Sequence, residues 1–218
     1  MSEAPLLLGH RGARRSTSVP ENTFASFDLA LDHGCGGFEF DVRLTGCGRA
    51  VVCHDPNVDG VTVSEANAGQ LLDLPHMEEV LNRYCARAFV DIELKVPGLE
   101  SKLLHSLREC RCEENYVVSS FLPGVVTELK ARNAHVQAGI ICDKPAQLAS
   151  FRELDTEYLI PHHSLITWKL VQEVHSVGKK MLAWTVNDSD SMLRLAEWGV
   201  DGIISDDTQL LVRTFRGK

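Results

Sequence analysis

The sequence predicts an α/β fold, a (β/α)8 TIM barrel with an extra β-hairpin strand after the second strand. Short β-branched or apolar segments alternate with helix-like segments along the chain, which is the pattern of parallel βαβ units. One strand must pair through a hairpin, and removing it leaves eight, the number that closes a parallel barrel. The alternative is an open doubly wound sheet, but Gly9-His10-Arg11-Gly12 is not the glycine-rich dinucleotide loop of that fold.

The individual elements follow from the same alternation. The expected strands are Leu6–His10, Gly37–Thr45, Ala50–His54, Phe89–Lys95, Tyr116–Ser119, Val136–Ile141, Tyr158–Pro161, Met181–Val186 and Gly202–Ser205. The expected helices are Thr23–Asp32, Glu78–Tyr84, Glu100–Glu109, Gly124–Arg132, Thr167–Val177 and Ser189–Trp198. Gly34, Gly178 and Gly199 each follow a helical segment, where a left-handed residue commonly ends a helix.

The segment Gly46-Cys47-Gly48-Arg49 joins the second and third strands and is too short for a crossover helix, so it predicts an antiparallel hairpin. A two-residue turn at Cys47-Gly48 would place His54 opposite Asp41. Any loop with an even number of residues keeps His54 on the face of Asp41, whereas an odd loop would turn it away. We expect the even loop.

Composition limits the partners. The 218 residues suit one domain, and 44% hydrophobic with 24% charged residues is typical of a globular protein. The formal charge of −8 argues against nucleic acid and anionic membranes, which attract basic surfaces. A small anionic substrate remains possible if a few cations gather at one site. Nothing in the sequence indicates an oligomeric state.

The sequence also predicts a location. Met1–His10 has no basic start and only a short apolar run, so no signal peptide is expected, and no later apolar run approaches the ~20 residues of a membrane span. The seven cysteines, at positions 35, 47, 53, 85, 110, 112 and 142, form no C-x-x-C pair. We therefore expect reduced thiols in a cytoplasmic protein without stable membrane anchoring.

Two acidic strands carry the strongest chemical signal. Glu39 and Asp41 are two residues apart on a strand, so they point to the same face. Asp91, Glu93 and Lys95 share a face in the same way, while the apolar residues between them point to the other. Carboxylates gathered at a barrel mouth repel one another unless a cation lies between them. The alternatives are a solvated or salt-bridged Glu39/Asp41 pair and an internal Glu93–Lys95 ion pair.

Further candidates end other strands. His10 and Arg11 follow the first strand, and Arg11 can bind phosphate or carboxylate oxygens through two hydrogen bonds. Trp184, near the end of a late strand, is either a core residue or a surface for substrate. Carboxylate ligands favour Mg²⁺ or Ca²⁺ over zinc. His10 and His54, together with Arg11 and Lys95, suit acid–base cleavage of a phosphodiester.

These segments resemble a known family. Gly9-His10-Arg11-Gly12, Pro20-Glu21-Asn22-Thr23, Glu39-Phe40-Asp41-Val42-Arg43-Leu44-Thr45 and Val51-Val52-Cys53-His54-Asp55 are similar to the opening of glycerophosphodiester phosphodiesterases. Asp91-Ile92-Glu93-Leu94-Lys95, Trp184-Thr185-Val186-Asn187 and Gly199-Val200-Asp201-Gly202-Ile203-Ile204-Ser205-Asp206 resemble its later strands. The resemblance covers essentially the whole chain, in the family's order.

The resemblance implies roles for these residues in one domain, 1–218. It implies one divalent cation, Mg²⁺ or Ca²⁺, held by the metal ligands Glu39, Asp41 and Glu93. His10 and His54 would be the catalytic acid–base pair, while Arg11 and Lys95 would bind the phosphate, with Trp184 nearby. The implied reaction is hydrolysis of a glycerophosphodiester to an alcohol and glycerol 3-phosphate. Either water or the adjacent glycerol hydroxyl would attack, and either histidine could be the base.

Three departures from the family pattern stand out. Cys47-Gly48 replaces the usual Asp-Gly, and the insertion segment at about 55–75 is short, which suggests a more open site. Ser205-Asp206-Asp207-Thr208 replaces the usual Thr-Asp-Arg-Pro, for which we expect only a structural consequence. Rival functions are a lysophospholipase D-like or sphingomyelinase D-like enzyme, a metal-dependent sugar isomerase barrel, and a non-catalytic binder of phosphorylated ligands.

Overall fold

The structure is a computed structural model that describes residues 4–112 and 114–216 of the chain. Within these residues, nine strands form one sheet in the order β1-β11-β10-β9-β8-β7-β6-β2-β3, and β1 also pairs with β2. The pairing of β1 (Leu6–Gly9) with both β11 (Gly202–Ser205) and β2 (Gly37–Leu44) is parallel and closes the barrel. β3 (Ala50–Val52) pairs antiparallel with β2 and lies outside the closed ring. The predicted barrel with one extra strand is therefore confirmed.

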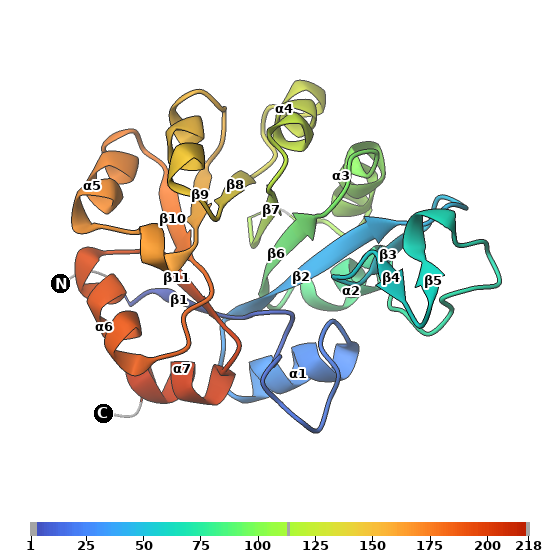
Figure 1. Ribbon diagram of the computed structural model, residues 1–218, viewed down its shortest axis with the longest axis horizontal. Coiled ribbons are helices and arrows are strands. Elements are labelled where there is room, and N and C mark those ends of the chain that lie inside the picture. The colour runs from blue at the N-terminus through green and yellow to red at the C-terminus, as the bar shows by residue number, and fades with distance from the viewer. Residues whose placement is uncertain (1–3, 113, 217–218) are drawn as a thin grey trace.

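The remaining elements follow the predicted alternation. The other barrel strands are β6 (Phe89–Leu94), β7 (Tyr116–Ser120), β8 (Ala138–Cys142), β9 (Tyr158–Pro161) and β10 (Lys180–Ala183). The helices are α1 (Phe24–Asp32), α2 (Met77–Tyr84), α3 (Glu100–Glu109), α4 (Pro123–Arg132), α5 (Trp168–Ser176), α6 (Ser189–Trp198) and α7 (Thr208–Arg216). Short 3-10 turns occur at Val63–Glu65, Pro145–Arg152 and His163–Leu165. Figure 1 shows the helices arranged around the strands.

Two elements were not expected from the sequence. The helix α7 follows the last strand, and Thr208 and Leu211 are its buried residues. The segment after β3 forms a small hairpin of β4 (Asn57–Val58) and β5 (Val61–Thr62), which lies beside β3 at the periphery of the barrel. This hairpin occupies the position of the short insertion segment.

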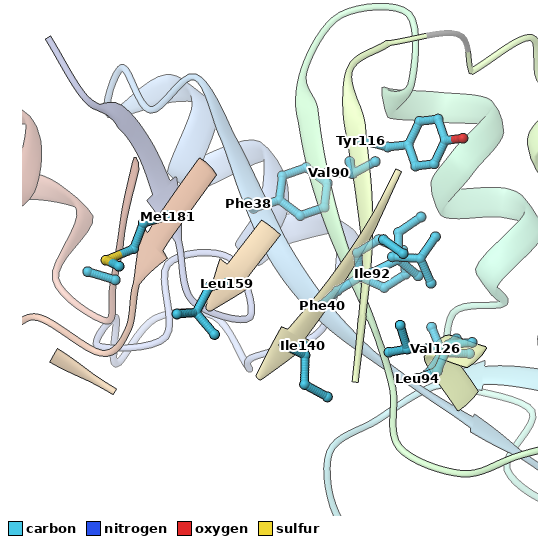
Figure 2. Close-up of a cluster of buried hydrophobic side chains, with 14 of the residues drawn as sticks. Phe38, Phe40, Val90, Ile92, Leu94, Tyr116, Val126, Ile140, Leu159 and Met181 are labelled. Atoms are coloured by element: carbon cyan, nitrogen blue, oxygen red, sulfur yellow. The ribbon is translucent and has the colours of Figure 1, made fainter. Parts of the chain in front are cut away.

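The core has two layers that follow the alternation of the strands. Phe38 and Phe40 on β2, with Ile92 on β6, point outward and pack under the helices (Figure 2). Phe27 of α1 stacks on Phe38 with ring centroids 4.3 Å apart. A second cluster fills the inside of the barrel, with Leu8, Val117, Ile141, Tyr158, Ile160, Leu182 and Ile204. The inward positions between the outward residues of β2 and β6 are therefore the acidic ones.

The predicted hairpin register is wrong. Val42 pairs with Val52 and Leu44 with Ala50, which leaves the three residues Gly46–Gly48 between the closing pair, an odd loop. Asp41 therefore faces Cys53, whose backbone N–H donates to the Asp41 carbonyl at 3.1 Å. His54 lies beyond the end of β3, so the alternation of the strand no longer directs its side chain.

One pair of cysteines also departs from expectation. Cys85, directly after α2, forms a disulfide with Cys112, which follows α3. Their Cα atoms are 5.5 Å apart, which is an ordinary separation for a disulfide. The prediction that the cysteines are reduced is therefore wrong for this pair. Among the described residues, no helix combines the length and apolar character that a membrane span requires.

Candidate active site

A cavity of about 120 Å³ opens at the carboxyl ends of the barrel strands, where active sites of such barrels lie. The cavity has a charged side from β1, β2 and β6 and an apolar side from the strands opposite. Its lining residues are His10, Arg11, Glu39, His54, Asp91, Glu93, Lys95, Phe121, Ile141, Ile160, Trp184 and Ile204. Seven of the eight residues singled out from the sequence line this cavity. The eighth, Asp41, is buried and contacts two of the lining residues, Arg11 and Lys95.

The parallel pairing of β2 with β6 brings the acidic side chains together. Asp41 pairs with Glu93 and Glu39 pairs with Asp91, so the acidic side chains of both strands point into the inside of the barrel. Glu39, Asp41 and Glu93 are buried, and each offers a carboxylate oxygen within 4.8 Å of the others. Glu39 Oε1 accepts no hydrogen bond from any residue that the structure describes, and Asp41 Oδ1 has only an ion pair with Lys95, 3.2 Å away. Buried carboxylates with oxygens left open in this way fit a divalent cation.

The pKa values of these carboxyls reflect their crowding. Burial, with repulsion from Asp41 and Glu93, raises the pKa of Glu39 well above its usual value. Burial also raises the pKa of Glu93 to about 7, although Lys95 opposes the shift. Asp91 lies deeper, accepts a hydrogen bond from Ser119 Oγ at 2.5 Å, and has a pKa raised to about 7, mainly by burial. The excess negative charge at this end of the barrel is thus unfavourable without a cation.

Two basic side chains lie against the same carboxylates. Lys95 Nζ is 2.6 Å from Glu93 Oε1 and 3.2 Å from Asp41 Oδ1, so the internal ion pair considered as an alternative is present. Arg11 Nε lies 3.2 Å from Asp41 Oδ2. Burial would raise the pKa of Asp41, but Lys95 and Arg11 outweigh it and lower that pKa. Both basic side chains also line the cavity.

His10 is held by an acidic residue from the last strand. Its Nδ1 lies 2.7 Å from Asp206 Oδ1, while its Nε2 is 3.8 Å from Glu39 Oε2. Burial would raise the pKa of Asp206, but the hydrogen bonds to His10, Asn187 and Arg14 lower it strongly. Asp206 belongs to the segment from which only a structural consequence was expected. Asp206 is the one residue of this segment that matches the family's Thr-Asp-Arg-Pro, so the expectation, which concerns Ser205, Asp207 and Thr208, stays a prediction.

His54 reaches the cavity in spite of the odd hairpin loop. The chain leaves β3 after Val52, and the His54 carbonyl accepts a hydrogen bond from Arg43 Nε at 2.7 Å. His54 Nδ1 lies 2.7 Å from Asp55 Oδ1, so this ring also has a carboxylate partner. Burial lowers the pKa of His54, although the hydrogen bond with Asp55 opposes the shift. In both histidines, Nδ1 thus lies within hydrogen-bond distance of a carboxylate oxygen.

Two residues that hydrogen-bond to site residues, Glu21 and Asn22, were not predicted as part of the site. Glu21 Oε1 accepts from Arg11 at 2.7 Å, and Asn22 Nδ2 donates to Asp41 Oδ2 at 2.8 Å. Arg11 and Asn22 both have left-handed backbones, with φ of 50° and 56°, and such residues outside glycine often mark functional sites. Glu21 and Asn22 lie in Pro20-Glu21-Asn22-Thr23, a segment that carries part of the family resemblance but was given no role in the site.

The apolar side of the cavity contains Trp184. Its Nε1 donates to the Ile160 carbonyl at 3.0 Å, and its ring contacts Phe121 edge to face with centroids 5.5 Å apart. Trp184 therefore both packs against the inner core and borders the cavity. The two interpretations of Trp184, core residue and substrate surface, are compatible in this position.

Comparisons with known proteins identify the family of this chain. The sequence matches the model of the Glycerophosphoryl diester phosphodiesterase family over residues 10–84 and 87–210. A glycerophosphodiester phosphodiesterase of Caldanaerobacter subterraneus subsp. tengcongensis is 32% identical over 241 residues, which cover 97% of this chain and 98% of that protein.

Solved structures are similar over the same extent. One is a phosphodiesterase of Oleispira antarctica in complex with the product sn-glycerol-3-phosphate, with 26% identity, a TM-score of 0.80, and coverage of 97% of this chain and 96% of that one. A glycerophosphodiester phosphodiesterase of Thermotoga maritima, at 22% identity and a TM-score of 0.83 over 98% and 99% of the two chains, shows the likeness of fold. The chain is an enzyme of the phosphodiesterase class and belongs to the glycerophosphoryl diester phosphodiesterase family.

Proposed function

We propose that this protein uses one divalent cation and two histidines to hydrolyse glycerophosphodiesters to an alcohol and glycerol 3-phosphate. The observation that carries the proposal is the set of buried carboxylates Glu39, Asp41 and Glu93, which lies next to His10 and His54. Within this set, Glu39 Oε1 accepts no hydrogen bond from the described residues. The relative from Oleispira antarctica, with sn-glycerol-3-phosphate as its product, supports the class of substrate.

Glu39, Asp41 and Glu93 would hold the cation, and an all-oxygen ligand set favours Mg²⁺ or Ca²⁺. When bound, the cation polarises a phosphoryl oxygen and stabilises the negative charge of the transition state. Arg11 and Lys95 would bind the other phosphate oxygens, because both already lie against the acidic cluster and carry fixed positive charge.

The histidines would move the protons. In neutral His10, an Nδ1–H donated to Asp206 leaves Nε2 as the acceptor that faces the acidic cluster. One histidine would take the proton from the attacking hydroxyl, either of water or of the glycerol. The other would protonate the leaving alcohol. Trp184 and Phe121 would contact the uncharged part of the substrate and exclude water from the apolar side of the cavity.

The test is a product assay on protein stripped of metal. Glycerophosphocholine and glycerophosphoethanolamine are offered with Mg²⁺, Ca²⁺ or EDTA, and glycerol 3-phosphate is measured. We expect release that requires a divalent cation and is lost in His10→Ala and Glu39→Ala. Cation-independent release, or full activity in either variant, would contradict the mechanism.

The apolar side of the cavity favours one second candidate. Phe121, Trp184, Ile141, Ile160 and Ile204 offer surface for a substrate with an apolar group, as in a lysophospholipase D-like reaction. Release of choline and lysophosphatidic acid from lysophosphatidylcholine, with little turnover of the soluble diesters, would favour this candidate over the first.

The location and partners remain proposals from the sequence. The formal charge of −8 argues against a nucleic-acid partner, and the product complex of the relative from Oleispira antarctica supports a small-molecule substrate. The Cys85–Cys112 disulfide counts against the cytoplasmic location expected from the sequence, because disulfides persist mainly in oxidising compartments. Separation of periplasmic, secreted and cytoplasmic fractions, with detection of the protein in each, would decide this point.

A further inference from the structure

Arg14 lies between the two carboxylates that hold the proposed catalytic side chains. Its Nε donates to Glu21 Oε2 at 2.7 Å, and its NH1 donates to Asp206 Oδ1 at 3.2 Å. The other oxygen of Glu21 accepts from Arg11, and the same oxygen of Asp206 contacts His10. The Arg14 guanidinium therefore links Glu21, which holds the proposed phosphate-binding residue Arg11, to Asp206, which holds the proposed acid–base residue His10.

These contacts form a closed path. His10, Asp206, Arg14, Glu21 and Arg11 alternate in charge when His10 is protonated, and the backbone between His10 and Arg11 completes the ring. A guanidinium has donors on several nitrogens in one fixed plane, so a single arginine can fix the relative positions of two carboxylates. Arg14 is 39% exposed and does not line the cavity, so the substrate is not expected to touch it.

We infer that Arg14 is a positioning residue for the reaction, acting on His10 through Asp206 and on Arg11 through Glu21. The inference rests on the proposed function, since His10 and Arg11 matter only if they act on the phosphodiester. Loss of Arg14 leaves Glu21 held by Arg11 and Asp206 held by His10 and Asn187, so each carboxylate has one fewer donor and is held less firmly. His10 and Arg11 then lose their fixed orientation together, so both kcat and KM are affected.

The neighbouring residue provides a matched control. Arg15 NH1 pairs with Asp207 Oδ2 at 3.3 Å, and its side chain is 64% exposed. Arg14→Ala and Arg15→Ala thus each remove one arginine and one or two ion pairs from the same loop. The hydrogen bond from the Arg15 backbone N–H to the Asp206 carbonyl does not depend on the side chain and remains in the control.

The experiment measures kcat and KM for glycerophosphocholine in the cation-loaded enzyme, with a melting temperature for each variant. We expect Arg14→Ala to lower kcat/KM about 10- to 100-fold, the usual effect of residues that orient catalytic groups. Arg15→Ala should stay within about twofold of the parent on the same scale. Millimolar guanidinium ion should restore activity to Arg14→Ala and not change Arg15→Ala, because the exposed position admits the ion.

A second readout does not need turnover. In protein labelled with ¹⁵N-histidine, the resonance of the His10 Nδ1–H, assigned with His10→Asn, should move in Arg14→Ala and remain in place in Arg15→Ala. If the parent cleaves no diester, the proposed function fails, and this resonance still tests Arg14. If Arg14→Ala does not fold, Arg14→Gln replaces it, since glutamine keeps a polar side chain at that position.

Three results would overturn the inference. Arg14→Ala, or Arg14→Gln in its place, could retain kcat/KM within about twofold of the parent, a change no larger than surface substitutions usually cause. The two alanine variants could lose activity equally, which would indicate a general effect of the loop. The His10 resonance could be unchanged in a folded Arg14 variant, which would show that Arg14 does not act on His10.

Discussion

His10 Nδ1 and Asp206 Oδ1 lie 2.7 Å apart although the two residues are separated by 196 positions in the chain. The parallel pairing of β1 with β11 places Gly9 opposite Ser205, so the residues that follow each strand meet at the mouth of the barrel. A carboxylate on Nδ1 fixes the orientation of the imidazole and stabilises its protonated form. This contact makes the end of the last strand part of the proposed catalytic apparatus.

Replacing Asp206 with asparagine should therefore impair the chemical step more than binding. We expect Asp206→Asn to lower kcat at least about 10- to 100-fold, because the amide neither favours the correct tautomer nor stabilises the protonated ring. KM should change little, and the steady-state assay of glycerol 3-phosphate release measures both constants.

The control for that variant is Asp207→Asn. Asp207 Oδ1 accepts from the Leu210 backbone N–H at the start of α7, and asparagine caps a helix nearly as well. Activity of Asp207→Asn should match the parent. Equal losses in the two variants would mean that the effect comes from the loop and not from the contact with His10.

Asn22 supports the acidic cluster in two separable ways. Its side chain donates to Asp41 Oδ2, and its backbone adopts φ of 56°. Asn22→Ala loses the donor and places alanine in a left-handed conformation, so both cation affinity and the free energy of unfolding should fall, the latter by about 1 kcal/mol. Asn22→Gly loses the same side-chain hydrogen bonds, including the one that Oδ1 accepts from the Asp41 backbone N–H, but it adds no backbone strain, since glycine adopts this conformation freely.

We expect cation affinity, measured by calorimetric titration, to fall about tenfold in both Asn22 variants. The melting temperature of the metal-free protein should fall more in Asn22→Ala. Parent-like cation affinity in Asn22→Gly would show that the amide of Asn22 does not help to orient Asp41 for the ion.

The sequence predicted the barrel and most of the site because both depend on local patterns. The alternation in β2 and β6 places Glu39, Asp41 and Glu93 inside the barrel whatever the details of the loops. The register of β3 was harder to predict, since a two-residue loop and a three-residue loop can both place a glycine at position 48, which here has φ of 83°. A loop that is longer by one residue turns every side chain of the following strand to the opposite face of the sheet. His54 reaches the site only because β3 ends before it.

Contacts between distant segments could not be predicted in this way. Asp206 and Arg14 meet because the barrel closes between β1 and β11, and no spacing in the sequence indicates that they pair. The Cys85–Cys112 disulfide is similar: its cysteines lie 27 positions apart, and only the packing of α2 beside α3 brings them together. Contacts between such distant residues depend on the tertiary structure, and no local sequence motif indicates them.

The disulfide leads to a prediction about stability. Closing a loop of this length should stabilise the fold by about 3 kcal/mol by restricting the unfolded chain. Cys85→Ser should therefore lower the melting temperature by several degrees, and reduction of the parent should do the same. Cys110→Ser, which leaves the disulfide intact, is the matched control. A parent whose intact mass does not increase on reduction would have no disulfide.

The metal-free protein should become less stable as the pH rises from about 4.5 to 7, because of Glu93. Its pKa is raised from 4.5 to about 7, chiefly by burial. Over this range the folded state binds more protons than the unfolded state, so the free energy of unfolding from this group falls with rising pH. Asp91, with a pKa of about 7, adds to the same trend.

A divalent cation should reverse this trend, because it binds the ionised carboxylates and competes with their protons. Its affinity should rise by up to about tenfold per pH unit below pH 7 for each proton displaced. Melting temperatures in EDTA and in saturating Mg²⁺ or Ca²⁺ should therefore differ more at pH 8 than at pH 5. Glu93→Gln keeps the size of the side chain but cannot ionise. In this variant the melting temperature should fall less with rising pH in EDTA, and the cation should raise the melting temperature less. If the cation raised the melting temperature equally at the two pH values, the ion would bind elsewhere than at these protonated carboxyls.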